Sequence, residues 1–118
     1  MALQSTALAS ADIVRIESVY DFGDRDEVLG FLDLHPFLVP ILIEASEIMP
    51  DYFPHGYALA LDLSIDPEFP EDRVLFAFVR SRMRADEALA HLDWLDRGGW
   101  LDAAPRARGE LVIDVDRL

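Results

Sequence analysis

Three histidines, His35, His55 and His91, are the side chains best suited to metal or acid–base chemistry in this sequence. Glu87 precedes His91 by four residues, a spacing that would place both on one helix face, where two metal ligands could meet. The same pair also fits the wet face of an ordinary helix. No histidine has a serine or aspartate partner in a recognised nucleophile motif. We therefore predict no catalytic residue, no metal site and no cofactor.

Carboxylates gather in and beside the connection between two expected strands. They are Asp62, Asp66, Glu68, Glu71 and Asp72. Oxygen-rich loops of this kind bind Ca²⁺. However, the spacing and central glycine of an EF-hand are absent, and Pro67 and Pro70 stiffen the segment. The pattern favours a solvated acidic hairpin tip over a cation site.

Arg80, Arg82 and Arg84 alternate just before a helix expected to begin near Ala85. In an extended chain the three side chains would point the same way, toward the positive end of that helix, and could hold a phosphate or carboxylate. Arg106 and Arg108 would be available to join them. The alternative is that these arginines balance nearby acids, which are Asp86 and Glu87.

Aromatic residues fall mostly at the ends of the expected elements, among acids. Trp94 points away from the apolar stripe of its helix, and Trp100 follows in a loop. Aromatic anchors within an acidic rim are typical of protein interfaces. The candidate partner-binding residues are Glu44, Glu47, Asp66, Glu68, Glu71, Asp72, Trp94 and Trp100. The alternative is a core edge capped by tryptophans.

The chain has 118 residues, with 23 acidic and 10 basic ones, so its net charge is −13. That charge disfavours direct binding of nucleic acid or of an anionic membrane. The absence of cysteine excludes disulfides, thiolate metal sites and thiol nucleophiles. The sequence lacks an apolar run long enough to span a membrane, and its start lacks the basic segment of a secretory signal. We expect a cytoplasmic protein with a flexible lead-in (1–11) and one domain (12–118).

Apolar periodicity predicts the elements that must position these residues. Strands are expected at 13–20, 57–65, 74–79 and 110–116; helices are expected from Asp24 to Pro36, over 37–49 and over 85–97. Residues 74–79 are apolar on both faces, which places that strand inside the sheet. The fold class is α+β: a two-layer sandwich with an antiparallel sheet, helices on one face and the ferredoxin-like β-α-β-β-α-β order. The alternative is an α-β-β-α-β chain without the first strand.

Three segments resemble a group of short, acidic, uncharacterised bacterial proteins. They are Leu34–Leu38, the turn Asp66–Pro67–Glu68, and Leu92–Asp93 through Trp100–Leu101–Asp102. The group has an "NPFLxxLLxEA" helix, a "DPE" turn and a "FDxxWW" ending, and this chain keeps only part of the last pattern. The resemblance supports the domain organisation and implies no activity.

Charge and size together favour a binding module over an enzyme. The first hypothesis is that the protein binds and neutralises or regulates a basic partner protein, as an antitoxin, an immunity protein or a regulatory subunit does. A second is a small-molecule-binding protein or small enzyme, with His35, His91 and Arg80 or Arg82 reaching a pocket between sheet and helices. A third is a structural homodimer that covers the open face of the sheet.

Overall fold

Four strands form one mixed sheet in the computed structural model, which describes residues 10–54, 56–100 and 104–118. In chain order they are β1 (Tyr20–Phe22), β2 (Ala58–Ile65), β3 (Arg73–Ser81) and β4 (Leu111–Arg117). They lie side by side in that same order. β1 runs parallel to β2, β2 antiparallel to β3, and β3 parallel to β4.

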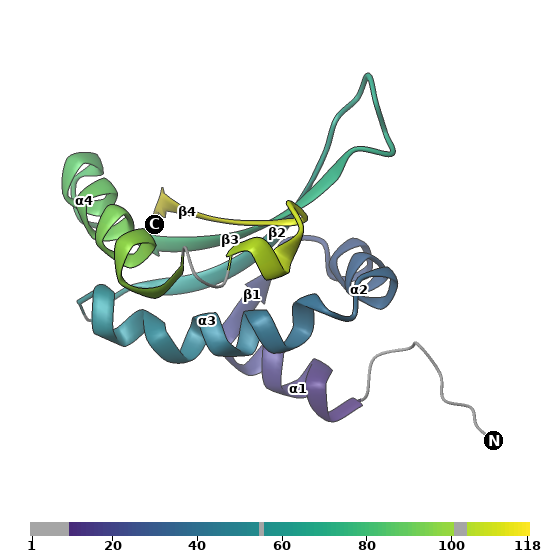
Figure 1. Ribbon diagram of the computed structural model, residues 1–118, viewed down its shortest axis with the longest axis horizontal. Helices are drawn as coiled ribbons and strands as arrows, with labels where there is room; N and C mark the ends of the chain where they lie inside the picture. Colours follow the sequence, from purple (N-terminus) through teal and green to yellow (C-terminus); the bar gives the residue numbers. More distant parts are fainter. Residues whose placement is uncertain (1–9, 55, 101–103) are drawn as a thin grey trace.

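Four helices accompany this sheet, and their apolar residues join those of the strands in one core (Figure 1). They are α1 (Ser10–Val19), α2 (Arg25–Leu34), α3 (Leu38–Tyr52) and α4 (Ala85–Leu95). A π-helical turn (Asp96–Trp100) follows α4, and a 3-10 turn (Ala104–Ala107) precedes β4. The α+β class is confirmed.

The ferredoxin-like order and the antiparallel sheet are wrong. A ferredoxin-like order would place the first strand inside the sheet, whereas β1 lies at the edge and pairs only with β2, through three residues. The connections through α2–α3 and through α4 each return the chain parallel to the strand it left and beside it. The sheet therefore grows in sequence order, as adjacent crossover units do.

The strand predicted at 13–20 is instead most of α1, and only Tyr20 belongs to a strand. Ile16, in α1, and Tyr20, the first residue of β1, are both buried. A strand over 13–20 would place the two on one face, but a spacing of four residues also suits one side of a helix. Val14, which an alternating strand would bury together with Ile16, is 67% exposed. The short β1 after this helix also sets the fold apart from the α-β-β-α-β alternative.

The two faces of the sheet differ in burial. The face toward the helices carries the odd-numbered residues of β2, β3 and β4, including Leu61, Leu75 and Ala77, which are fully buried. The other face carries even-numbered residues such as Phe76 and Phe78, which are half-buried. The interior position of β3 is confirmed, because β2 and β4 flank it, but its predicted burial on both faces is wrong.

α2 begins where the sequence predicts a helix, with Asp24 as its N-terminal cap. The backbone N–H of Glu27 donates a 3.1 Å hydrogen bond to Oδ1 of Asp24, which satisfies one of the free donors at the helix start. Val28, Phe31 and Leu32 then turn toward the core.

Replacing Asp24 by alanine is expected to lower the free energy of unfolding by about 1 kcal/mol, because the Glu27 N–H loses its acceptor. Urea denaturation measures this difference. The matched control is Asp24→Asn, which retains a capping oxygen and should stay close to the wild type. Equal stability of wild type and Asp24→Ala would show that the cap contributes nothing.

α3 lies beneath the sheet and contributes the largest share of its helical cover (Figure 1). Pro40 falls in its first turn, where no N–H is needed. The expected helix ended at 49, but α3 continues through Pro50 to Tyr52. The Tyr20 hydroxyl donates a 2.8 Å hydrogen bond to the Leu42 carbonyl, and burial raises the pKa of Tyr20 far above its usual range.

α4 confirms part of the predicted stripe. Ala88 and Leu95 are buried, and Trp94 points outward as expected, with 55% of its surface exposed. Leu89 belongs to the same apolar stripe by its spacing from Leu92 and Leu95, but it is 54% exposed. The helix expected over 85–97 ends at Leu95, and the π-helical turn that follows contains Gly98 and Gly99 and carries the chain on to Trp100.

Candidate partner-binding surface

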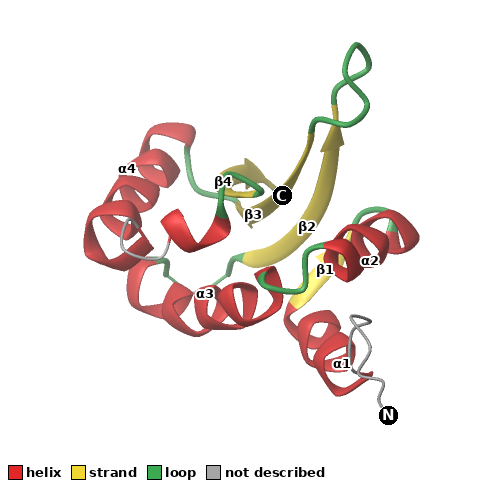
Figure 2. Ribbon diagram, turned by 45° about the vertical axis from the view of Figure 1, so that its right-hand side comes forward, coloured by secondary structure: helices red, strands yellow, loops and turns green. Residues whose placement is uncertain are grey.

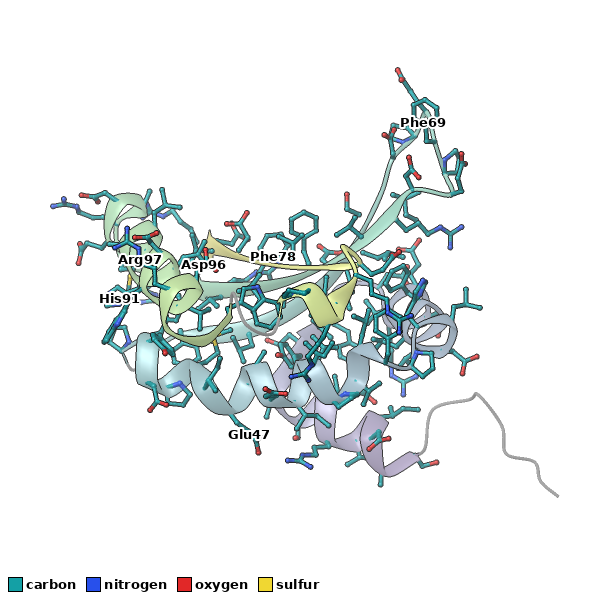
Figure 3. All side chains as sticks on the ribbon, viewed as in Figure 1. Glu47, Phe69, Phe78, His91, Asp96 and Arg97 are labelled. Carbon is teal, nitrogen blue, oxygen red and sulfur yellow. The ribbon has the colours of Figure 1, made fainter. Side chains whose placement is uncertain are left out.

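The hairpin joining β2 and β3 projects from the body of the protein as an arm (Figures 1 and 2). Its tip is closed by local bonds: the Asp72 N–H donates to the Phe69 carbonyl at 2.8 Å, and the Glu68 N–H donates to Oδ1 of Asp66 at 2.9 Å. Figure 3 places Phe69 at the end of the arm, where 52% of its surface is exposed.

All four predicted acids of the hairpin are exposed at this tip. They are Asp66, Glu68, Glu71 and Asp72. None of them forms an ion pair with another described residue, and Arg73 beside them donates to the Pro70 carbonyl instead. The arm therefore presents uncompensated negative charge around one exposed aromatic ring.

The two predicted acids of α3 are in a different state. Glu44 is bound by Arg106 at 2.9 Å, and Glu47 by Arg15 at 3.2 Å. The Arg106 guanidinium holds the pKa of the Glu44 carboxyl below its usual value through this hydrogen bond. Glu47 lies on the underside, opposite the open sheet face (Figure 3). The structure thus separates these acids from the hairpin and compensates their charge.

The two tryptophans also differ. Trp94 stands exposed on α4, with its ring edge-on to Tyr52 at 5.2 Å between centroids. Trp100 is 6% exposed and belongs to the core cluster. As folded, Trp100 is not a surface anchor. This outcome matches the alternative of a core edge capped by tryptophan.

The three arginines proposed as an anion site are bound to acids or stand apart. Arg84 contacts Asp86 at 2.6 Å and Glu87 at 3.6 Å, which is the charge-balancing alternative. Arg80 contacts Asp116 at 3.4 Å on the open sheet face. Arg82 is exposed. Arg80 and Arg84 therefore neutralise neighbouring acids, and the three arginines do not converge on a common anion site.

The histidines lie in separate places. Nδ1 of His35 is 2.9 Å from the Phe31 carbonyl, and its ring stacks on Phe31. Nδ1 of His91 donates to the Tyr52 carbonyl at 2.8 Å, which ties α4 to the end of α3. His55 lies outside the described residues. Within the described part of the chain, no three side chains of histidine or carboxylate type group together as metal ligands.

The predicted pocket residues do not share one cavity. His35 lines a surface hollow of about 300 Å³ with Glu71, Arg73 and Glu110 among its other walls. Arg80 lies on the open sheet face, and His91 lies against Tyr52 and Phe53 at the end of α3. A reaction site built from these three groups is therefore not assembled.

The open sheet face carries a feature that the sequence analysis missed. Phe76 and Phe78 stack on each other there, with ring centroids 5.4 Å apart and planes inclined by 15°. Val112 beside them is 39% exposed. The continuous apolar run 74–79 concealed this pair, because it indicated burial on both faces. Alternating aromatic residues at 76 and 78 were the available signal.

Comparison with protein-family models, with curated proteins and with solved structures finds no match. Among the described residues, no single helix is long and apolar enough to cross a membrane. α2 and α3 reach that length and composition only together, across a bend of 117°.

Proposed function

We propose that the protein binds a basic partner protein through its acidic hairpin arm and thereby neutralises or regulates that partner. The observation that supports the proposal is that the hairpin acids form no ion pair with any described residue, whereas Glu44 and Glu47 are each bound by an arginine. A carboxylate that is already held in an ion pair exerts little long-range attraction on a basic partner protein. Free charges on a projecting arm act over about one Debye length, roughly 8 Å at physiological salt.

Phe69 adds an apolar contact surface to the electrostatic field of the hairpin acids. An exposed phenylalanine ringed by carboxylates combines apolar area at the centre with charge at the rim. In such interfaces rim charges set the association rate, and the buried aromatic group slows dissociation. The arm therefore supplies both parts of a docking contact.

The test compares three immobilised forms of the protein exposed to an extract of its native host. They are the wild type, a hairpin variant (Glu68→Gln, Glu71→Gln, Asp72→Asn) and a control variant (Asp26→Asn, Glu27→Gln, Asp51→Asn). Both variants lose three negative charges. Asp66 is retained because its side chain holds the turn. We expect the wild type and the control to capture the same basic protein, released at high salt.

The hairpin variant should capture that protein roughly tenfold less efficiently at low salt, since it lacks the steering charges. Equal loss in both variants would reduce the effect to net charge and would contradict a role for the arm. Failure of the wild type to capture any basic protein at low or high salt would overturn the proposed function.

A further inference from the structure

The open face of the sheet is both aromatic and acidic. It brings together the stacked rings of Phe76 and Phe78 with the carboxylates of Asp62, Asp114 and Asp116, all at even-numbered positions. Asp21 of β1 joins them, because it lies opposite Ala60 of β2. Arg80 is the only cation among the even-numbered strand residues of this face. Figure 3 shows Phe78 on the side of the sheet away from α3. A cationic, partly planar group would therefore match this face in both charge and shape.

One arginine of the protein itself already occupies half of this face. The guanidinium carbon of Arg80 lies 5.9 Å from the centroid of the Phe78 ring, and Nε lies 3.4 Å from a carboxylate oxygen of Asp116. Arg80 is thus held by an aromatic face and a carboxylate together. Guanidinium groups favour this combination because they stack on rings and pair with acids at the same time.

The other half of the face offers the same two groups without an arginine. Asp62 on β2 lies directly opposite Phe76 on β3 in the strand register, as Asp116 lies directly opposite Arg80. Asp62 is exposed and forms no ion pair with any described residue. Asp62, Ser64, Phe76 and Phe78 line a surface hollow of about 350 Å³. The hollow thus has room for a side chain from outside.

Gly23 makes room for the Asp62 carboxylate. The Gly23 N–H donates to the Leu61 carbonyl at 2.9 Å, which holds the turn after β1 against β2. A methyl group at position 23 would lie 2.7 Å from Oδ1 of Asp62. The absence of a side chain at Gly23 therefore lets the carboxylate rest where it stands, beside the hollow.

We propose that Phe76 and Asp62 form a docking site for an arginine side chain of a basic partner protein. This proposal rests on the proposed function only for the charge of that partner. A second copy of the chain is disfavoured as the occupant, because it would bring its own excess of carboxylates against Asp62 and Asp114. Lysine fits less well, since its ammonium group cannot stack on the ring as a plane.

The test uses two fluorescent peptides with the same spacing of charges, one of alternating arginine and serine and one of alternating lysine and serine. Binding to wild type, Phe76→Leu, Asp62→Asn and Asp51→Asn is measured by anisotropy at low salt. Phe76→Leu removes the aromatic face, and Asp62→Asn removes the carboxylate. Asp51→Asn, on α3 in the layer below the sheet, controls for net charge.

We expect the wild type and Asp51→Asn to prefer the arginine peptide by roughly fivefold. The preference should vanish in Phe76→Leu, and Asp62→Asn should weaken arginine-peptide binding more than Asp51→Asn does. Circular dichroism checks that each variant is folded. If Phe76→Leu does not fold, the comparison of Asp62→Asn with Asp51→Asn decides.

Equal affinity for the two peptides, or an arginine preference that survives in Phe76→Leu, would overturn the site. So would a wild-type dimer by sedimentation that Phe76→Leu converts to a monomer, because the occupant would then be a second copy. These outcomes are independent of the capture experiment with the hairpin variants. A wild type without arginine preference would therefore not contradict the role of the arm. Failure of the capture experiment would likewise not contradict the arginine site.

Discussion

Replacing Trp100 by alanine is expected to lower the free energy of unfolding by about 3–5 kcal/mol, a large fraction of the stability of a domain this size. Trp100 is 6% exposed and lies in the core cluster at the end of the π-helical turn. Truncation removes a large apolar side chain from contact with its neighbours. The remaining cavity adds to the loss, because a packed core relaxes only in part.

Trp94→Ala is the matched control, since it removes the same atoms six residues earlier. Its ring is 55% exposed and contacts Tyr52 edge-on, so we expect a loss of roughly 1 kcal/mol or less. Urea denaturation followed by circular dichroism measures both variants. Similar stability of the two variants would contradict the placement of Trp100 in the core and restore its role as a surface anchor.

Replacing Gly98 by alanine is expected to destabilise the protein by about 1–3 kcal/mol, the usual cost of forcing extra volume into a packed site. An added methyl group at Gly98 would overlap the hydroxyl and ring carbons of Tyr52. The Tyr52 ring cannot move freely, because it also packs against Trp94 and the core. Gly98 is therefore required for the close approach of the π-helical turn to α3.

Gly30→Ala provides the opposite case. Gly30 lies inside α2, and a methyl group there meets nothing within 4 Å. Alanine should stabilise that helix by roughly 0.5–1 kcal/mol, because glycine loses more backbone entropy on folding. Thermal denaturation of the two variants should give shifts of opposite sign. A stabilising effect of Gly98→Ala would refute the contact with Tyr52.

Local pattern was sufficient for much of the secondary structure. The cap at Asp24, the alternation that ends at Ile65 and the apolar stripe containing Ala88 and Leu95 each depend on residues within one or two turns of one another. Their structure follows from short-range geometry. The same reasoning failed for 13–20, where Ile16 and Tyr20 satisfied both a strand and a helix. In the structure α1 packs against α3, where Arg15 pairs with Glu47. A tertiary contact of this kind is not visible in a local pattern.

For the candidate partner-binding surface, too, the sequence predicted some features and only the tertiary structure decided the others. Composition revealed the net charge of −13 and the acids of the hairpin. It did not reveal that Glu44 is compensated by Arg106, 62 residues away, while the hairpin acids have no ion-pair partner among the described residues. Nor did it reveal that Asp62 faces Phe76, because that pairing depends on the register between β2 and β3.

The sequence by itself determined the class of the fold and the sign of the surface charge. Because it contains no cysteine, it also excluded disulfides, thiolate metal sites and thiol nucleophiles. The tertiary structure decided the strand order, the burial of Trp100 and which acids pair with an arginine among the described residues. The physical reason is range. Periodicity, capping and composition act between neighbours in the chain, whereas sheet order and charge compensation arise from contacts between residues far apart in sequence.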